Sequence, residues 1–438
     1  MRVGSMARGA RSMSVWSLTT WRAHGGMVMV RRMPDGTPWD RPGCVRAAAM
    51  LLRMSHAYDR LDLAALHERP LMKWQHYEKD VLPLWVADMD FPIAEGVRAA
   101  LRAYADGDLH GYPLWSGVPG LRETLAERLL ERFGWSVEPD WIWIIPGTVA
   151  ALFGAVKGFT AQGDGVLATT PIYPPFRAAT VKQGRTFQEV DMVERDGGFR
   201  IDPAALDEAV TVSSRLLMLC HPHNPTGRVL DRSELEGLAE RVLEHRLFVA
   251  SDELHSDLNF GTPHVPFASL SPEISARTIT FLGPTKTFNL AGLKIGFAIA
   301  ENPEVLERFK EAMFGFAMPA PAVSQAGALG AYRDGQAWYE DTMAYLRANR
   351  DHLKARIDGM EGVSMYTPEA TYLAWLDFRG GPLAEAPAAQ LVERARLGLN
   401  EGTTFGASGA GFARLNFATS RAIVDDAADR IERALRTS

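Results

Sequence analysis

FLGPTKTFNLAGLKIG, residues 281–296, joins two apolar runs that are rich in β-branched and aromatic residues. The first run, Thr278–Leu282, and the second, residues 295–300, are predicted to be buried strands separated by a Gly-Pro turn and a glycine-containing link. Lys286 thus stands just past the end of a buried strand. Lysine is rarely buried without a partner or a chemical role, and a desolvated amine with a lowered pKa is suited to attack a carbonyl carbon. A surface lysine is the simpler alternative, and this stretch alone does not decide between the two.

Two upstream segments also carry a polar residue where a strand ends. LLMLCHPHNPTG places Asn224 after a strand, and LFVASDELHSDL places Asp252 just after a strand at residues 247–250. Strands and helices alternate from about residue 140 to 300, which predicts an α/β fold: a mostly parallel sheet with helices on both faces, in three layers. Ligands bind beyond the carboxyl ends of the strands in such sheets. Asn224, Asp252 and Lys286 are therefore expected at one site.

The order of these three residues, 28 positions apart (224 to 252) and 34 apart (252 to 286), resembles the fold-type-I pyridoxal-phosphate enzymes, the aspartate aminotransferase superfamily. The resemblance implies pyridoxal 5'-phosphate as cofactor and Lys286 as the catalytic residue that forms a Schiff base with it. It also implies that Asp252 is the carboxylate at the pyridine nitrogen and that Asn224 is the amide at the ring hydroxyl.

More specific motifs extend from about residue 60 to the C-terminus: VLPLWVADMDFP, SDELHSDL, TYLAWLDF and GFARLNFA. They resemble the MalY/PatB branch of that superfamily, which contains cystathionine β-lyase-type C–S lyases. The resemblance implies β-elimination on L-cystathionine or cysteine S-conjugates, with release of thiol, pyruvate and ammonia. An aminotransferase that passes an amino group to a 2-oxoacid would use the same residues and is the alternative. A non-catalytic regulator with this fold is expected to lack Lys286 or Asp252, and both are present.

The segment WIWIIPGTVAALFGAVKGF reads as a strand at residues 141–145, a Pro-Gly turn and a helix from Thr148. A helix start presents free N–H groups and a positive dipole end, so the cofactor phosphate is expected on Gly147, Thr148 and Val149. An ordinary βα turn is the alternative. The resemblance further implies that Tyr173 stacks on the cofactor ring, that Thr285 is the nearby hydroxyl, and that Lys294 replaces an arginine at the phosphate.

Two residues have an expected role at the substrate or at a partner chain. Arg414 lies mid-strand in an apolar run, and its planar fork suits a carboxylate. The resemblance aligns it with the arginine that binds the substrate α-carboxylate, whereas an internal salt bridge is the alternative. Tyr112, in a Gly- and Pro-containing loop, is implied to reach across a homodimer interface to the partner's cofactor phosphate, which gives shared active sites.

Asp88 and Asp90 are expected to fix a loop near the substrate entrance by hydrogen bonds rather than to bind metal. His221 and His223 have no spaced Cys or His partner set, so no metal site is predicted.

A net charge of −6 argues against a general nucleic-acid binder, and no apolar run is long enough to cross a membrane. The partner that the resemblance implies is a small amino-acid substrate. Two cysteines cannot build a disulfide framework, which favours a reducing cytoplasm.

Composition suggests four segments. Residues 1–53 hold nine arginines and two acidic residues, and they are expected to be a disordered tail or a non-native extension, with a transit peptide as the alternative. Residues 54–105 are expected to form an N-terminal arm and part of a small domain, 106–320 the large cofactor-binding domain, and 321–438 a C-terminal α+β domain.

The other predicted elements are helices at 93–105, 234–244 (with Ser233 as N-cap), Pro303–Met313, 387–397 and 423–436, a long helical region at 322–358, and strands at 371–378 and 411–418.

Overall fold

The computed structural model describes residues 18–23, 26–31, 56–108, 110–195, 197–315 and 319–436. The chain divides into residues 1–59 and residues 60–438. In the first unit, strands β1 (Leu18–Ala23) and β2 (Gly26–Arg31) pair antiparallel. The prediction of a disordered or non-native extension at 1–53 otherwise lies outside the described residues. The second unit holds all the elements discussed below, and boundaries within it near residues 105 and 320 stay predictions.

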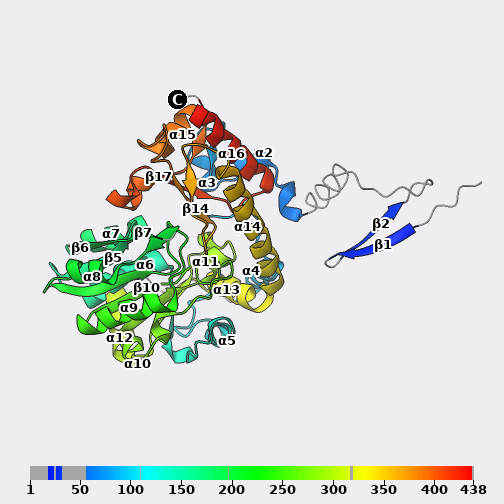
Figure 1. The fold of residues 1–438 in the computed structure, drawn as a ribbon. Helices are drawn as coiled ribbons and strands as arrows, with labels where there is room; N and C mark the ends of the chain where they lie inside the picture. The colour runs from blue at the N-terminus through cyan, green and yellow to red at the C-terminus, as the bar shows by residue number, and fades with distance from the viewer. Residues whose placement is uncertain are drawn as a thin grey trace, which may run out of the picture. The chain divides into compact units, whose positions relative to one another are not determined.

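A seven-stranded sheet forms the middle of the second unit (Figure 1). Its strands, in spatial order, are β4 (Ile142–Ile145), β12 (Gly296–Ile299), β11 (Thr278–Leu282), β10 (Phe248–Asp252), β9 (Ser214–Cys220), β5 (Gly165–Thr170) and β6 (Thr186–Asp191). All pairs are parallel except those of β12, which runs antiparallel to β11 and β4. The mostly parallel sheet of the predicted α/β fold is therefore present.

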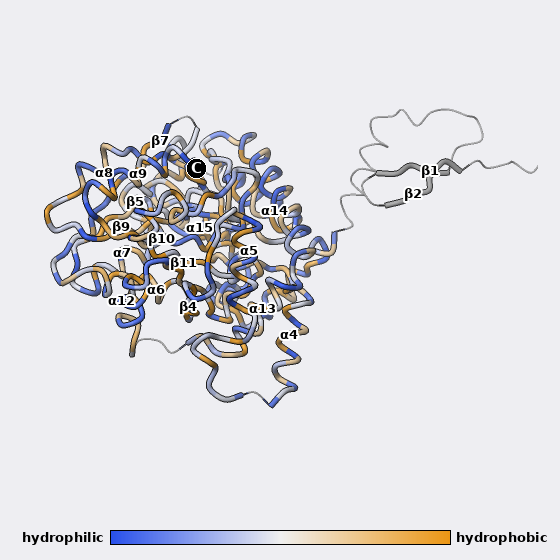
Figure 2. Tube along the Cα trace, turned by 90° about the horizontal axis from the view of Figure 1, so that it is seen from below, coloured by the Kyte–Doolittle hydropathy of each residue, from blue (hydrophilic) through white to orange (hydrophobic). Residues whose placement is uncertain are grey.

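Helices cover both faces of this sheet because alternate residues of each buried strand point to opposite sides. In β9, Leu216 and Met218 pack with helices α6 (Thr148–Phe159) and α12 (Pro303–Met313). Leu217 and Leu219 pack on the other side with α8 (Pro203–Ala209) and α9 (Arg232–Glu244). Figure 2 shows hydrophobic segments of the trace gathered around the central strands β9, β10 and β11. The three layers expected from the sequence are confirmed.

A smaller α+β part is built from both ends of the second unit. Its antiparallel sheet has the order β13 (Ser364–Met365), β14 (Leu373–Asp377), β17 (Phe412–Asn416) and β16 (Asn400–Glu401). In the chain, helix α15 (Pro387–Ala395) lies between β14 and β16, and helix α16 (Arg421–Arg436) follows β17 (Figure 1). From the N-terminal side, β3 (Leu82–Pro83) pairs in parallel with β15 (Leu397–Gly398). This pairing joins the arm that precedes α4 (Glu95–Asp106) to the C-terminal part.

The structure refines one element prediction and contradicts another. The helical region 322–358 is interrupted at Gly335, which separates α13 (Ala322–Asp334) from α14 (Gln336–Ile357). A side chain there would meet the Ala331 carbonyl and the Phe288 ring, so the glycine allows a close approach that ends the helix. Helix α9 begins at Arg232 and its N-cap is Asp231, not Ser233. Asp231 accepts from the Glu234 N–H at 2.9 Å, and Glu234 accepts from the Asp231 N–H at 3.0 Å.

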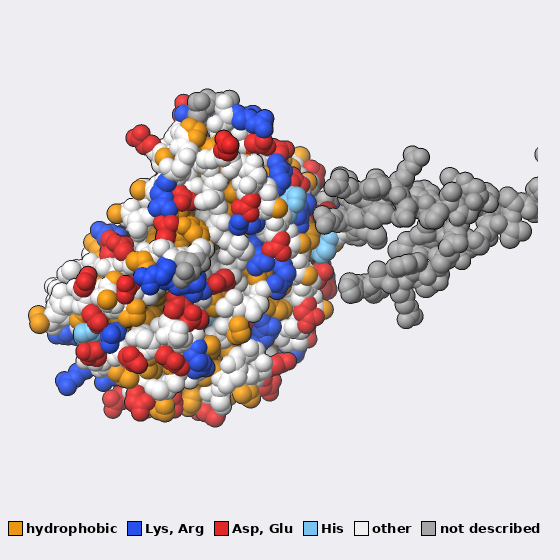
Figure 3. All heavy atoms as spheres, viewed as in Figure 1, with side chains coloured by type: hydrophobic (Ala, Val, Ile, Leu, Met, Phe, Trp, Pro, Cys, Tyr) orange, Lys and Arg blue, Asp and Glu red, His pale blue; other side chains and the backbone are white. Residues whose placement is uncertain are grey.

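The remaining predicted helices and strands are present, with the predicted ends for β11 and α12 and with ends that differ by one to a few residues for the others. Helix α5 (Leu121–Phe133) was not predicted. Among the described residues, no helix is both long and apolar enough to span a membrane. Figure 3 shows acidic and basic side chains interspersed over the face that it presents.

Candidate active site

A cavity of about 510 Å³ opens at the carboxyl ends of the central strands. Its wall contains ten of the eleven predicted site residues: Gly147, Thr148, Val149, Tyr173, Asn224, Asp252, Thr285, Lys286, Lys294 and Arg414. This volume lies within the range typical of small-molecule sites. Tyr112 is the exception, because it is not among the lining residues and its side chain is 95% exposed.

Lys286 lies on the short helix α11 (Pro284–Thr287), directly after β11, and Asp252 ends the neighbouring strand β10. The Lys286 amine donates a hydrogen bond to the Ala87 carbonyl at 2.7 Å. Burial lowers the pKa of Lys286, the carboxylate of Asp88 acts against this, and the cation of Arg414 adds to it. An amine in this setting is more readily unprotonated than a surface lysine, which is what a nucleophile or general base requires.

The carboxyl group of Asp252 is buried and accepts a hydrogen bond from the Leu254 N–H at 3.2 Å. Burial raises the pKa of Asp252 to about 7, with Glu253 adding to the rise and Lys286 opposing it. A cationic group placed beside Asp252 would favour the ionised carboxylate. The site can therefore hold a protonated ring nitrogen there.

Arg414 is a buried cation on β17 whose partners are oxygens of neutral groups. It donates to Asn224 Oδ1 at 2.9 Å, to the Trp85 carbonyl at 3.0 Å and to Asn400 Oδ1 at 2.5 Å. Its Nε atom is buried without a hydrogen-bond partner, and burial lowers the pKa of Arg414 to about 10. No ion pair of Arg414 occurs within the described ranges, so the predicted alternative of an internal salt bridge is not observed there. The free Nε favours an anionic ligand.

The start of α6 also lines the cavity. Gly147 is its N-cap with φ 104°, and no side chain caps the first N–H groups of Thr148 and Val149. Lys294, in the left-handed conformation after the turn η4 (Ala291–Leu293), brings an ammonium group to the same cavity. Free N–H groups and a nearby cation suit a phosphate. Tyr173, the N-cap of α7 (Pro174–Val181), is another lining residue of the cavity.

His255 is a site residue that the sequence argument did not identify, although SDELHSDL contains it. It lines the cavity three residues after Asp252, and its Nδ1 atom is buried without a hydrogen-bond partner. Burial lowers the pKa of His255 to about 3, so the ring is neutral and can donate or accept one hydrogen bond toward a ligand. The sequence signal that could have identified His255 as a site residue was its position three residues after Asp252. Asn400 and Ala87 were also missed, and no local pattern marks them.

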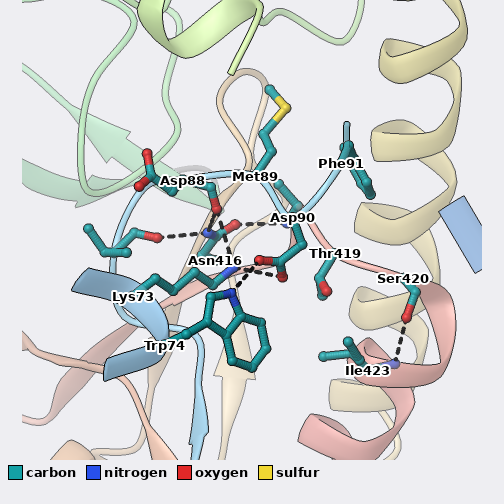
Figure 4. Close-up of polar contacts among 12 residues, drawn as sticks. Lys73, Trp74, Asp88, Met89, Asp90, Phe91, Asn416, Thr419, Ser420 and Ile423 are labelled. Carbon is teal, nitrogen blue, oxygen red and sulfur yellow. Dashed lines mark hydrogen bonds and ion pairs between the residues drawn. The ribbon is translucent and has the colours of Figure 1, made fainter. Parts of the chain in front are cut away.

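Asp90 lies behind the cavity rather than in its wall. Its Oδ2 atom accepts from Lys73 Nζ at 2.8 Å and its Oδ1 atom from Trp74 Nε1 at 3.0 Å (Figure 4). The partners are thus side chains, not the nearby backbone groups that the sequence suggested. His223 pairs with Thr226 Oγ1 at 2.9 Å and His221 stacks on His264.

The only metal-like grouping among the described residues is Asp207, Glu244 and His245 on the surface. There Asp207 already pairs with His245 and Arg241.

Comparisons with known proteins agree with this geometry. Residues 79–431 match the family model for aminotransferase class I and II. Cystathionine beta-lyase PatB of Bacillus subtilis (strain 168) is 36% identical over 366 residues, which cover 81% of this chain and 93% of that protein.

Two solved structures share the fold over nearly their whole length. The crystal structure of OvoB has a TM-score of 0.83 at 36% identity and covers 87% of this chain and 100% of that one. Cystalysin from Treponema denticola, whose structure contains a pyridoxal 5'-phosphate cofactor, has a TM-score of 0.82 at 30% identity over 87% of this chain and 100% of that one. At these identities the likeness extends beyond the fold to the family.

Proposed function

The chain belongs to the aminotransferase class I and II family, and from this premise we propose that it is a pyridoxal 5'-phosphate-dependent C–S lyase. It acts by β-elimination on L-cystathionine or another cysteine S-conjugate and releases a thiol, pyruvate and ammonia. One observation carries the proposal: Lys286, Asp252 and the buried cation Arg414, which has no ion pair among the described residues, line one cavity. The similarity to cystathionine beta-lyase PatB supports the lyase reaction over amino transfer.

The groups in the cavity fit this cofactor. The uncapped N–H groups of α6 suit its phosphate, and the buried carboxyl group of Asp252 suits its pyridine nitrogen. The residues that would hold it are Gly147, Thr148, Val149, Thr285 and Lys294 at the phosphate, Tyr173 at the ring face, Asn224 at the ring hydroxyl, Asp252 at the nitrogen and Lys286 at the aldehyde carbon.

When bound, pyridoxal 5'-phosphate supplies an aldehyde carbon that combines with amines and a ring that draws electrons from the substrate Cα. Arg414 binds the α-carboxylate of the substrate through its planar fork. Lys286, released as a free amine, takes the proton from Cα, and its lowered pKa suits it to act as a base near neutral pH. Asp252 in its ionised form keeps a proton on the ring nitrogen.

Loss of the Cα proton leads to cleavage of the bond between Cβ and sulfur. The electron pair left at Cα forms a Cα–Cβ double bond, and the thiolate leaves with the pair of the broken bond. The unsaturated amino acid that remains reacts with water and yields pyruvate and ammonia. If the proton were instead returned to the cofactor carbon, the same residues would support amino transfer, which is the alternative function.

We also propose a homodimer in which Tyr112 reaches the partner's cofactor phosphate. The homodimer is supported by three exposed residues of one loop, Tyr112, Leu114 and Trp115, which are 95%, 64% and 61% exposed. Large exposed apolar side chains close together mark an interaction surface. A reducing cytoplasm remains part of the proposal and is supported by the buried, unpaired Cys220.

The experiment that tests the function mixes the purified protein, pyridoxal 5'-phosphate and L-cystathionine with no 2-oxoacid present. Pyruvate and free thiol are followed over many turnovers, with Lys286→Ala as the inactive control. Sustained release of both products is expected. A single turnover that resumes only after a 2-oxoacid is added would establish the aminotransferase instead. No product under either condition would reject both functions for this substrate class.

A further inference from the structure

Residues 85–91, WVADMDF, form a segment that we call the arm loop. Trp85, Val86 and Ala87 line the active-site cavity. The carbonyl groups of the arm loop accept hydrogen bonds from side chains that are distant in sequence: Trp85 O from Arg414 (3.0 Å), Val86 O and Asp88 O from Asn416 (2.7 Å each), Ala87 O from Lys286 (2.7 Å) and Tyr372 (3.0 Å), Met89 O and Phe91 O from Asn289 (3.0 and 2.9 Å). The arm loop is therefore held through its backbone.

Two of these donors are the groups on which the proposed function depends. Lys286 has one hydrogen-bond acceptor among the described residues, the Ala87 carbonyl. Arg414 has three: Trp85 O, Asn224 Oδ1 and Asn400 Oδ1. A displacement of the arm loop would therefore remove the only acceptor of the Lys286 amine, whereas Arg414 would keep two of its three.

Behind the arm loop lies a fully buried ion pair. Lys73 and Asp90 are each 1% exposed, and Lys73 Nζ lies 2.8 Å from Asp90 Oδ2. Lys73 also donates to the Asp88 carbonyl at 3.3 Å, and the Trp74 indole donates to Asp90 Oδ1 at 3.0 Å. Figure 4 shows Lys73 and Trp74 extending from the short helix α3 (Met72–Gln75) to the Asp90 carboxylate.

Stability alone is a poor reason for this arrangement. Removing two charges from water is expensive, and replacing a buried ion pair by apolar side chains is often neutral or stabilising. The ion pair instead fixes the orientation of the groups that it joins, because each of its hydrogen bonds has a defined length and angle. Lys73 and Asn416 together hold the Asp88 carbonyl, and Asn416 also holds the Val86 carbonyl. The Ala87 carbonyl lies between these two restrained positions.

We propose that the Lys73–Asp90 ion pair, with the Trp74 indole, positions the Ala87 carbonyl so that it receives the Lys286 amine whenever that amine is free. These three are positioning residues, since none of them lines the cavity. The proposal rests on the proposed function, in which Lys286 must be released and held ready to take a proton. The same positioning role applies to the cofactor-free chain, where the hydrogen bond from Lys286 to the Ala87 carbonyl is observed.

The test uses the triple variant Lys73→Met/Trp74→Phe/Asp90→Leu. It removes every polar group of the cluster at once, leaves no buried partner unpaired and does not change net charge, so it is expected to fold. The Asp88 carbonyl keeps its bond from Asn416. Leu238→Ala, a cavity-forming change in the core under α9, is the control for lost stability without any effect on the arm loop.

The first measurement is the rate at which the cofactor-free chain takes up pyridoxal 5'-phosphate as a function of pH. The uptake requires an unprotonated Lys286. The charged groups that face this amine are Asp88 on the arm loop, Arg414 on β17, Lys294 after η4 and Asp252 on β10, and none of them is altered. Loss of the carbonyl acceptor destabilises the ammonium form, so the midpoint should fall by about one pH unit in the triple variant and stay unchanged in Leu238→Ala.

The second measurement is steady-state kinetics with L-cystathionine. In the triple variant kcat should fall about tenfold or more, while KM changes by less than about twofold, because Arg414 retains Asn224 and Asn400. An unchanged uptake midpoint with an unchanged kcat would overturn the proposal. So would a rise in KM alone, because that pattern would assign the cluster to substrate binding.

Two further outcomes keep the test decisive. If the triple variant does not fold, Trp74→Phe alone, which removes one of the three bonds, should lower the midpoint in the same direction by a smaller amount. No shift in that variant would also overturn the proposal. If the wild-type chain releases no thiol yet the midpoint shifts as expected, the proposed function fails while the positioning role stands.

Discussion

At the scale of single residues, Lys286 and Arg414 bring two positive charges to one cavity. Among the residues that the structure describes, their hydrogen-bond partners are carbonyl and amide oxygens. A buried charge without a counter-ion is unfavourable, and an anion that enters the cavity relieves this penalty. The site therefore favours ligands that carry carboxylate or phosphate groups.

Arg414→Lys is expected to raise KM for L-cystathionine about 10- to 100-fold, with a smaller change in kcat. Lysine keeps the charge but lacks the planar fork that binds a carboxylate at two points. Steady-state kinetics measures both constants. Arg333→Lys on the surface is the matched control and should behave as the wild type. An unchanged KM in Arg414→Lys would show that another group binds the substrate carboxylate.

Asp252→Asn is expected to stabilise the cofactor-free chain more at about pH 8 than at about pH 5. The pKa of Asp252 is raised by burial from 3.8 to about 7, so between these two pH values the folded state holds a proton that the unfolded state has lost. The wild-type chain therefore loses stability as the pH rises from 3.8 to about 7, and asparagine, which does not titrate, removes this dependence. Thermal unfolding of both proteins at the two pH values measures the difference. Glu253 titrates in the same sense in both proteins, so a constant difference between them would contradict the assignment.

At the scale of elements, the cavity is formed where three strand ends and one helix start converge. Asp252 ends β10, Lys286 follows β11 and Asn224 follows β9, while α6 begins after β4. β9, β10 and β11 are parallel, and β4 runs in the same direction because both β4 and β11 are antiparallel to β12, so the helix start lies at the same edge of the sheet. The helix start offers N–H groups that no side chain occupies, so its backbone conformation decides how well it binds an anion.

Gly147→Ala is expected to weaken the binding of pyridoxal 5'-phosphate about tenfold. The φ of Gly147 is 104°, a conformation that costs an L-residue on the order of 1–2 kcal/mol, so the turn before α6 must shift. No atom lies within 4 Å of the added methyl group, so a clash is not the cause. An absorbance titration measures the affinity. Gly380→Ala, which is equally open and has no positive φ, should bind as the wild type.

At the scale of the whole molecule, the exposed side chains of Tyr112 and Trp115 are those that a partner chain is expected to cover. If Tyr112 serves the partner's site, an equal mixture of Tyr112→Ala and Lys286→Ala chains, each nearly inactive alone, should regain activity after subunit exchange. Half of the dimers would be hybrids with one complete site each, so about a quarter of the wild-type rate is expected. Lyase activity before and after mixing measures this.

The matched control mixes Lys286→Ala with Asp252→Asn chains, whose altered residues lie in the same site of one chain. In a hybrid of these two chains, one site lacks Lys286 and the other lacks Asp252, because each chain supplies both residues to its own site. No complete site forms in the hybrid, so this mixture should stay inactive. Equal recovery in both mixtures would argue against a shared site that contains Tyr112.

The sequence alone predicted elements whose pattern is contained in consecutive residues. Helix α12 was predicted with its observed bounds, because Pro303 marks its start and its apolar residues recur at helical spacing. The break at Gly335 was not predicted, since a glycine inside a helical pattern is often tolerated and only the packing of Phe288 shows why the helix ends there. Asp231 and Ser233 are both good N-caps by type, and the reciprocal bond from Glu234 decides between them.

For the active site too, some features could be predicted from consecutive residues and others required the folded structure. The α/β class and the positions of Asn224, Asp252 and Lys286 at strand ends could be predicted from the sequence, because strands and turns depend on near neighbours in the chain. The packing of the folded chain was needed to show that the Ala87 carbonyl, 199 residues away, accepts a hydrogen bond from the Lys286 amine, and that His255 lines the cavity. Only it showed that Asp90 is paired with Lys73 in the interior. These contacts depend on how layers from both ends of the chain pack together, and no local pattern in the sequence carries that information.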